Sequence, residues 1–313
     1  MPALATVATG MLGLLAATLA AFLWSIATVL WRRVGRIMPP VRINLVKGIT
    51  ATIMLGGVVA WQAARDDHNP LALPPGLLAI MIASGVIGLA GGDTCFFAAL
   101  NRLGARRTLL MFMLAPVLTA LLAWPVLGQP LSLLQGLGIV LTCGGIAWVI
   151  AERTTGPADG HVDALGLTFA IGAAVCQAIG ALMSRHVFDQ VDYGAAPSAL
   201  VRIIAGTVAV AFLLPLDKHL RTPDTNGEPP TATLNTWLTL AVAVLLGTVF
   251  GIWLQQTSFK LSDNVGVAST LLATSPLFVL PITAAMGEQV SIRAITGAAI
   301  GVLGIAILMG ALG

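Results

Sequence analysis

Charged side chains are scarce in this sequence. Asp, Glu, Lys and Arg together make up 9% of its 313 residues, whereas a soluble domain normally carries about 25%. Apolar residues make up 57% of the chain, too many for a surface that faces water. The composition therefore excludes a soluble enzyme.

Other features are also missing. Three cysteines, an odd number inside apolar stretches, argue against a disulfide framework. The net charge of +3 is spread over loops with no basic run that alternates with aromatics, so we expect no nucleic-acid partner. The sequence contains no phosphate-binding GxxxxGK[ST] motif, no metal-ligand spacing among its four His and no Ser/His/Asp set at one depth. We therefore expect no catalytic residues, no metal and no cofactor.

Long apolar runs take up most of the chain. Each run is about 20 residues long, which is the length of a membrane-spanning helix. Strand-like alternation of polar and apolar residues is absent from these runs, which excludes a closed barrel. We predict an all-α integral membrane protein in a lipid bilayer, with ten transmembrane helices. Their expected ranges are 10–31, 41–62, 77–100, 106–127, 132–151, 164–184, 197–216, 234–258, 264–286 and 291–311.

The two halves of the chain resemble each other. Residues 13–34 align with 166–187, and Pro116 falls on Pro276. The polar stretch 152–163 separates a first repeat, 10–151, from a second repeat, 164–311. Because five is an odd number of spans, the second half would enter the membrane from the opposite face. This predicts an inverted repeat, an architecture that in transporters places the substrate near the midplane between the halves.

Ordered motifs in both halves make the chain similar to a known family. They are Trp24-Ser25, Gly92-Asp93, the run 115–124 that begins Ala-Pro-Val-Leu, Gly128-Gln129, Ser275-Pro276 and Gly287-Glu288. Over nearly its whole length the chain resembles the EamA family of the drug/metabolite transporter superfamily. The chain departs from the family in its first half, where the family's usual Gly-Glu pair reads Gly128-Gln129. The glutamate of this motif could therefore come from Glu288 alone.

The resemblance implies ten helices in two five-helix EamA repeats. It also implies secondary transport, with outward movement of a small metabolite such as an amino acid. We expect a multi-pass protein of a bacterial-type inner membrane.

The distribution of basic residues conflicts with the orientation that the resemblance implies. Loops on the side of the termini hold three Lys or Arg, and loops on the other side hold eleven. Basic loops favour the cytoplasm, so the count predicts that both termini lie outside. The resemblance implies that both termini lie in the cytoplasm. Both orientations stay open, and we favour the charge count.

Three charged residues are expected at membrane depth, where charge is costly and often functional. Asp93 lies roughly 10 Å from one face at 1.5 Å per residue, and Lys47 lies at a matching depth. They could form an ion pair that responds to protons or is displaced by substrate, or a static pair. Arg202, the repeat counterpart of Lys47, could bind an anionic group or simply pack with its charge near the surface.

Polar and aromatic residues in the spans are further candidates. Asn44, Gln177, Gln255 and Gln256 could hydrogen-bond substrate or join helices. Trp24, which aligns with Gln177, could stack on an apolar part of the substrate or only pack.

Three prolines interrupt helical hydrogen bonds and are either hinges or tolerated kinks: Pro116, Pro276 and Pro281.

The leading interpretation is a secondary transporter for a small molecule, with protons as a candidate coupling ion. A membrane-embedded enzyme and a passive channel or interaction protein are the alternatives. Small residues on spans 5 and 10 are expected to pack helices together, and those spans could form a homodimer surface.

Overall fold

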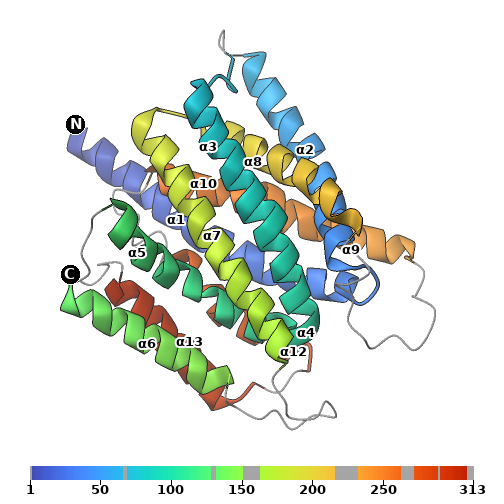
Figure 1. The fold of residues 1–313 in the computed structure, drawn as a ribbon, viewed down its shortest axis with the longest axis vertical. Helices are drawn as coiled ribbons and strands as arrows, with labels where there is room; N and C mark the ends of the chain where they lie inside the picture. Colours follow the sequence, from blue (N-terminus) through green and yellow to red (C-terminus); the bar gives the residue numbers. More distant parts are fainter. Residues whose placement is uncertain are drawn as a thin grey trace.

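The computed structural model describes residues 2–65, 69–127, 132–150, 163–215, 232–261, 271–287 and 290–308 (Figure 1). Residues 152–162 of the predicted linker 152–163, together with Gln129 and Glu288, fall outside these residues. Within the described ranges the regular elements are helices, as predicted. They are α1 Pro2–Gly35, α2 Pro40–Ala63, α3 Pro75–Gly85, η1 Val86–Gly92, α4 Asp93–Phe112, α5 Leu114–Leu127, α6 Leu133–Ile150, α7 Ala164–Gln190, α8 Ala195–Leu213, α9 Leu234–Val244, η3 Leu245–Phe250, α10 Gly251–Leu261, α12 Ser275–Ala285 and α13 Ile292–Leu308.

These elements form ten passes in the described part of the chain. The third pass joins α3, η1 and the first part of α4, while the rest of α4 continues into α5 as the fourth. The eighth pass joins α9, η3 and α10. Six helical stretches of the described residues are long and apolar enough to span a membrane. The start of α1 and the end of α13 lie on the same side of the bundle (Figure 1), as an even number of passes requires.

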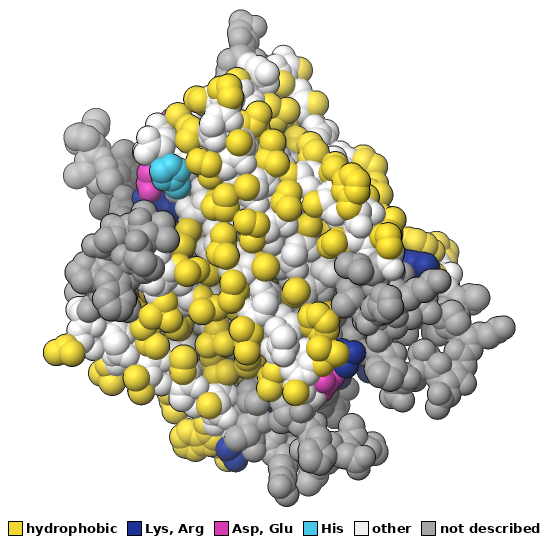
Figure 2. Space-filling view, in the orientation of Figure 1, with side chains coloured by type: hydrophobic (Ala, Val, Ile, Leu, Met, Phe, Trp, Pro, Cys, Tyr) yellow, Lys and Arg dark blue, Asp and Glu magenta, His cyan; other side chains and the backbone are white. Residues whose placement is uncertain are grey.

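The outer surface is mostly apolar. Figure 2 shows hydrophobic side chains spread over the helices, with the few coloured charges at the margins of that face. Large apolar side chains such as Phe212 and Leu234 are 79% and 74% exposed, which water would penalise and lipid would not.

Local sequence explains where several helices begin or break. Pro40 follows the extended Pro39 at the start of α2, where its missing N–H costs nothing. The Asp163 side chain accepts hydrogen bonds from the N–H groups of Leu165 and Gly166 and so caps α7. Gly104 breaks α4 between the third and fourth passes with φ +80°, a left-handed conformation that glycine adopts without strain.

The third pass of each half contains a π-helical segment, η1 in the first half and η3 in the second. A neighbouring helix donates a side-chain hydrogen bond to a carbonyl of each segment. Asn44 Nδ2 lies 2.8 Å from the Leu89 oxygen, and Trp24 Nε1 lies 2.7 Å from the Gly247 oxygen. Segments of this type are rare and often mark functional sites. Both halves therefore widen the same pass at the same relative place.

The fifth and tenth passes, α6 and α13, lie side by side at one edge of the bundle (Figure 1). Their glycines face each other so closely that a Cβ on Gly145 would lie 2.7 Å from the Gly297 oxygen. The Thr142 hydroxyl, 3.3 Å from the Gly301 oxygen, adds a hydrogen bond between the two helices. The small residues of spans 5 and 10 thus pack these helices within one chain.

Candidate functional site

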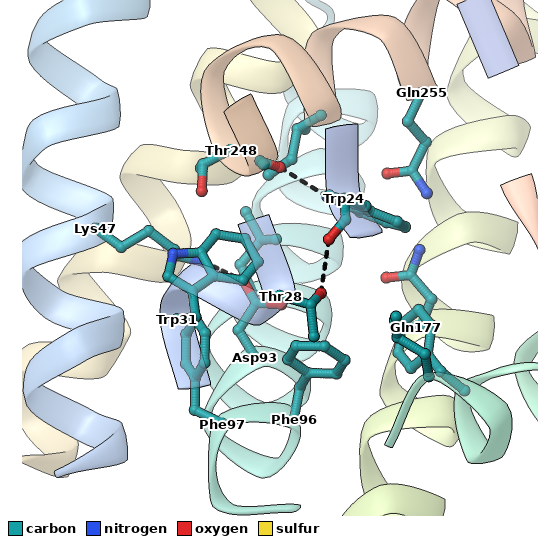
Figure 3. A pocket seen from close by; sticks show the side chains of 15 residues that line it. Trp24, Thr28, Trp31, Lys47, Asp93, Phe96, Phe97, Gln177, Thr248 and Gln255 are labelled. Carbon is teal, nitrogen blue, oxygen red and sulfur yellow. Dashed lines mark hydrogen bonds and ion pairs between the residues drawn. The ribbon is translucent and has the colours of Figure 1, made fainter. Parts of the chain in front are cut away.

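A cavity lies between the two halves of the molecule, at the level of the π-helical segments (Figure 3). Its empty volume is about 540 Å³ when the open space at its mouth is included. The first half contributes all five aromatic residues, and the second contributes the polar residues Gln177, Thr248 and Gln255. The full lining is Trp24, Thr28, Trp31, Lys47, Leu89, Asp93, Phe96, Phe97, Leu109, Phe112, Gln177, Gly247, Thr248, Ile252 and Gln255.

A second lobe of about 450 Å³ adjoins the first. Four residues, Trp24, Phe112, Gln177 and Gln255, line both lobes and form the waist between them. From the waist the second lobe extends toward the side of the termini, where Thr119 and Phe259 are among its lining residues. The second lobe therefore lies between the first lobe and the side of the termini.

The Lys47 ammonium and the Asp93 carboxylate form an ion pair in the wall of the first lobe (Figure 3). Lys47 is 4% exposed and its Nζ lies 5.5 Å from the centre of the Phe97 ring, a cation–π contact. Asp93 is 27% exposed and directly follows η1. Both residues line the cavity, so the pair is within reach of a substrate.

Aromatic rings form a chain along one wall of the first lobe. Successive edge-to-face contacts join Trp24 to Phe112 at 6.2 Å and Phe112 to Phe96 at 5.5 Å. Phe96 continues to Phe97 at 5.9 Å, and Phe97 to Trp31 at 5.3 Å. These rings offer an apolar surface on the first-half side of the cavity.

Trp24 is held in place by its own polar atom. Its Nε1–H donates to the Gly247 oxygen, and Gly251 leaves room for the indole, since a Cβ there would lie 2.9 Å from Nε1. Opposite Trp24, the side-chain amides of Gln177 and Gln255 point into the cavity (Figure 3). Neither amide has a hydrogen-bond partner among the described residues, since the bond at Gln255 uses its backbone oxygen. Each therefore has donors and an acceptor free for a ligand.

Three predicted residues lie outside both lobes and are bonded to protein. Arg202 is 1% exposed, and its Nη1 donates to Gln256 Oε1 at 3.1 Å. Gln256 in turn donates to the Ser198 hydroxyl. Asn44 donates to the Leu89 oxygen and to Thr94 Oγ1, so its amide supports η1.

Breaks in the fourth and ninth passes accompany two of the predicted prolines. A turn at Met113 precedes α5, in which Pro116 lies, and a turn at residues 273–274 precedes α12, in which Pro276 lies. The Ser275 hydroxyl donates to the Leu272 oxygen, the carbonyl that Pro276 cannot bind. Pro116 lines the second lobe, whereas Pro281 lies inside α12.

Sequence reasoning missed Trp31 and Thr248, which also line the first lobe. Trp31 comes seven residues after Trp24, the spacing that puts two side chains on one helix face, and this signal could have found it. For Thr248, which lies within η3, the sequence offers no comparable signal.

Ion pairs outside the spans tie the passes together at the two ends. Arg102 Nη1 lies 2.9 Å from Asp163 Oδ2 and joins the third pass to the start of α7. This hydrogen bond is the main cause that lowers the pKa of Asp163. At the other end Lys260 Nζ lies 2.8 Å from Asp192 Oδ1 and lowers the pKa of that carboxyl. Among the described residues no group of three or more His, Cys, Asp or Glu could hold a metal ion.

Comparison with known proteins gives a family and a fold. The sequence model described as the EamA-like transporter family matches residues 11–151 and again residues 164–310. A solved crystal structure, described only as that of a protein, superposes with a TM-score of 0.64 at 19% identity. The match covers 94% of this chain and 95% of that one, which shows a shared fold. A comparison with curated proteins finds no significant match.

Proposed function

Because this chain belongs to the EamA-like transporter family, we propose that it exports a small metabolite by alternating access around the cavity between its halves. Membership makes the chain a multi-pass membrane transporter of two EamA domains and not an enzyme. The substrate class that we propose is that of amino acids and similar small amphipathic molecules. The driving force is a gradient of substrate or protons.

The observation that carries this proposal is the Lys47–Asp93 pair in the wall of the cavity. An ion pair at membrane depth is costly to maintain, and one open to a cavity can change partners. A proton on Asp93, or a substrate group that replaces Lys47 there, would release the lysine. The pair therefore supplies a step at which substrate or proton binding can alter the contact between the second and third passes.

The breaks in the fourth and ninth passes give the two halves matching places to bend. Pro116 and Pro276 follow these breaks, and Pro116 also lines the second lobe. We assign both prolines, with Pro281 further along α12, to hinges that open one side of the cavity as the other closes. The repeat boundaries that go with this motion are 10–151 and 164–311, joined by 152–163.

The proposed setting is a bacterial-type inner membrane with both termini outside, as the charge count favours. Any homodimer would use the outward faces of α6 and α13, because their glycines face each other. Exposed apolar side chains on these faces include Leu133, Val140 and Ile292.

Transport by purified protein tests the proposal. The protein is reconstituted in liposomes that hold a mixed metabolite extract, and mass spectrometry follows the compounds that leave with and without a pH gradient. We expect selective, saturable loss of one compound class, with countertransport when the same compounds are placed outside. A passive channel predicts flux without saturation or countertransport, and no selective loss from folded protein would contradict the transporter function.

A further inference from the structure

Two buried polar groups in the first lobe lack a partner within the described part of the chain. The Trp31 side chain is 5% exposed and Thr248 is 1% exposed. Trp31 Nε1 and Thr248 Oγ1 are buried atoms without a hydrogen bond, although both residues line the cavity. Buried polar groups are almost always bonded, so each such atom needs an explanation. A ligand in the cavity would supply the missing partner for both.

The same end of the cavity holds a third donor. The Lys47 ammonium carries three N–H groups, of which Asp93 takes one in the structure. Figure 3 shows the Thr248 hydroxyl on the side of the cavity where Lys47 and Trp31 also lie. The indole N–H has no acceptor capacity, and the ammonium has none either. A ligand group that satisfies all three residues must therefore accept hydrogen bonds.

Charge favours an anionic acceptor. Away from their ends, the described spans contain two cations, Lys47 and Arg202, and one acid, Asp93. Arg202 lies against η1, since a Cβ on Gly88 would lie 3.1 Å from its Nη2, and Asp93 directly follows η1. With all three groups ionised, this region has one uncompensated positive charge at membrane depth. A single negative charge on the substrate would balance it, and the aromatic wall leaves little polar surface for a more highly charged group.

We propose that Trp31 and Thr248, together with Lys47, form a subsite that binds the carboxylate of the substrate. The indole N–H and the Thr248 hydroxyl donate to the two carboxylate oxygens, and Lys47 balances the charge. The remainder of the substrate lies along the aromatic wall toward Gln177 and Gln255. This subsite rests on the proposed transport function and makes the substrate a small carboxylic acid in its ionised form.

The test uses the liposomes loaded with mixed metabolite extract. We expect the compounds lost selectively to carry a carboxylate, and the primary amide of a lost acid to compete for efflux at least about ten-fold more weakly than the acid. Thr248→Val keeps the side-chain shape and removes the hydroxyl, so it should weaken the acid about ten-fold and leave the amide nearly unchanged. Trp31→Phe removes the indole N–H and should likewise reduce the preference for the acid over the amide.

Thr239→Val is the matched control. Thr239 lies in α9, in the same pass as Thr248, is half-buried, and already bonds the Asn235 oxygen of its own helix. This control should keep the full preference for the acid. An equal loss of acid and amide in Thr248→Val, or selective efflux of compounds without a carboxylate, would overturn the subsite while leaving the transport function standing. Absence of any selective efflux would instead overturn both.

Discussion

Asp93 is the residue on which we propose that coupling to protons depends. It is the carboxylate that lines the cavity within the described spans, and it binds the ammonium of Lys47. Replacing its carboxylate by an amide keeps the size and removes the site that a proton could occupy. We expect Asp93→Asn to abolish pH-driven uptake into liposomes while exchange of substrate across the membrane continues.

Asp189→Asn serves as the control for this variant. Asp189 is half exposed near the end of α7 and pairs with Arg185 four residues earlier, away from the first lobe. We expect its pH-driven uptake to equal that of the parent protein. Undiminished pH-driven uptake in Asp93→Asn would remove Asp93 from the coupling mechanism.

Sequence reasoning at this scale found charged residues more readily than the cavity lining. The matching depths of Lys47 and Asp93 were enough to predict a pair that the structure forms. In the sequence, Arg202, Gln256 and Asn44 cannot be told apart from the polar residues that line the cavity. In the structure each bonds to protein groups outside the two lobes. Whether a polar side chain faces a cavity or a neighbouring helix depends on the rotation of each helix, which a strongly apolar span hardly specifies.

At the scale of elements, the α6–α13 pair depends on glycine. A Cβ on Gly145 would meet the backbone oxygen of Gly297 at 2.7 Å, and backbone cannot move aside as a flexible side chain can. We expect Gly145→Ala to destabilise the protein by about 1–3 kcal/mol through overpacking. The thermal unfolding midpoint of the purified protein in detergent measures this loss.

Gly144→Ala is a control one residue away. A Cβ on Gly144 would meet nothing within 4 Å, so the change adds a methyl group in open space. Its unfolding midpoint should match the parent protein or exceed it slightly, since Ala favours helix over Gly. Equal midpoints for the two variants would show that the close approach of α6 and α13 contributes little to stability.

The Arg102–Asp163 contact joins two elements outside the spans and gives the protein a pH-dependent stability. Its hydrogen bond lowers the pKa of Asp163 in the folded state, so the ionised carboxylate stabilises the fold above the usual carboxyl pKa. This contribution is lost as the pH falls through the lowered pKa, below about pH 4. Asp163→Ala removes both the ion pair and the cap of α7, at a cost of about 1 kcal/mol at neutral pH.

Unfolding midpoints at pH 7 and pH 3 test this assignment. The midpoint of Asp163→Ala should lie below that of the parent protein at pH 7, and the gap should narrow at pH 3. The midpoint of Asp163→Asn at pH 7 should lie between those of Asp163→Ala and the parent protein, because Asn still caps a helix but cannot form an ion pair with Arg102. A gap of the same size at both pH values would show that the carboxylate charge contributes nothing.

The elements themselves were mostly predictable from the sequence. Runs of apolar residues between Pro-rich and charged breaks placed most ends of the passes to within a few residues, because a bilayer fixes their length. Two ends were wrong by more: α1 begins at Pro2 rather than at residue 10, and α7 continues to Gln190 rather than ending at 184. The predicted start of the ninth span, 264, falls outside the described residues. The π-helical segments were not predictable. Their shifted hydrogen bonds are supported by Asn44 and Trp24 from other helices, and such long-range contacts leave no local pattern.

At the scale of the whole molecule, the two lobes define which side of the membrane each part of the cavity can reach. Thr119 lines the second lobe, on the side of the termini, whereas Leu109 is 3% exposed and lines the first lobe. In a background without Cys95, Cys143 and Cys176, we expect a membrane-impermeant thiol reagent to modify Thr119→Cys from the side of the termini. Leu109→Cys should react slowly from that side.

Alternating access adds a second expectation, because the far side must open when the near side closes. Conditions that drive transport should increase the rate at which the thiol reagent modifies Leu109→Cys from the side opposite the termini. They should decrease the rate at which it modifies Thr119→Cys from the side of the termini. Rapid reaction of both positions from both sides at once would indicate a passive channel. In intact cells the same measurement decides the orientation: reaction of Thr119→Cys from outside agrees with the eleven basic residues on the opposite side. Reaction from the cytoplasm alone would put both termini inside, and the basic loops would then face outward against the usual rule.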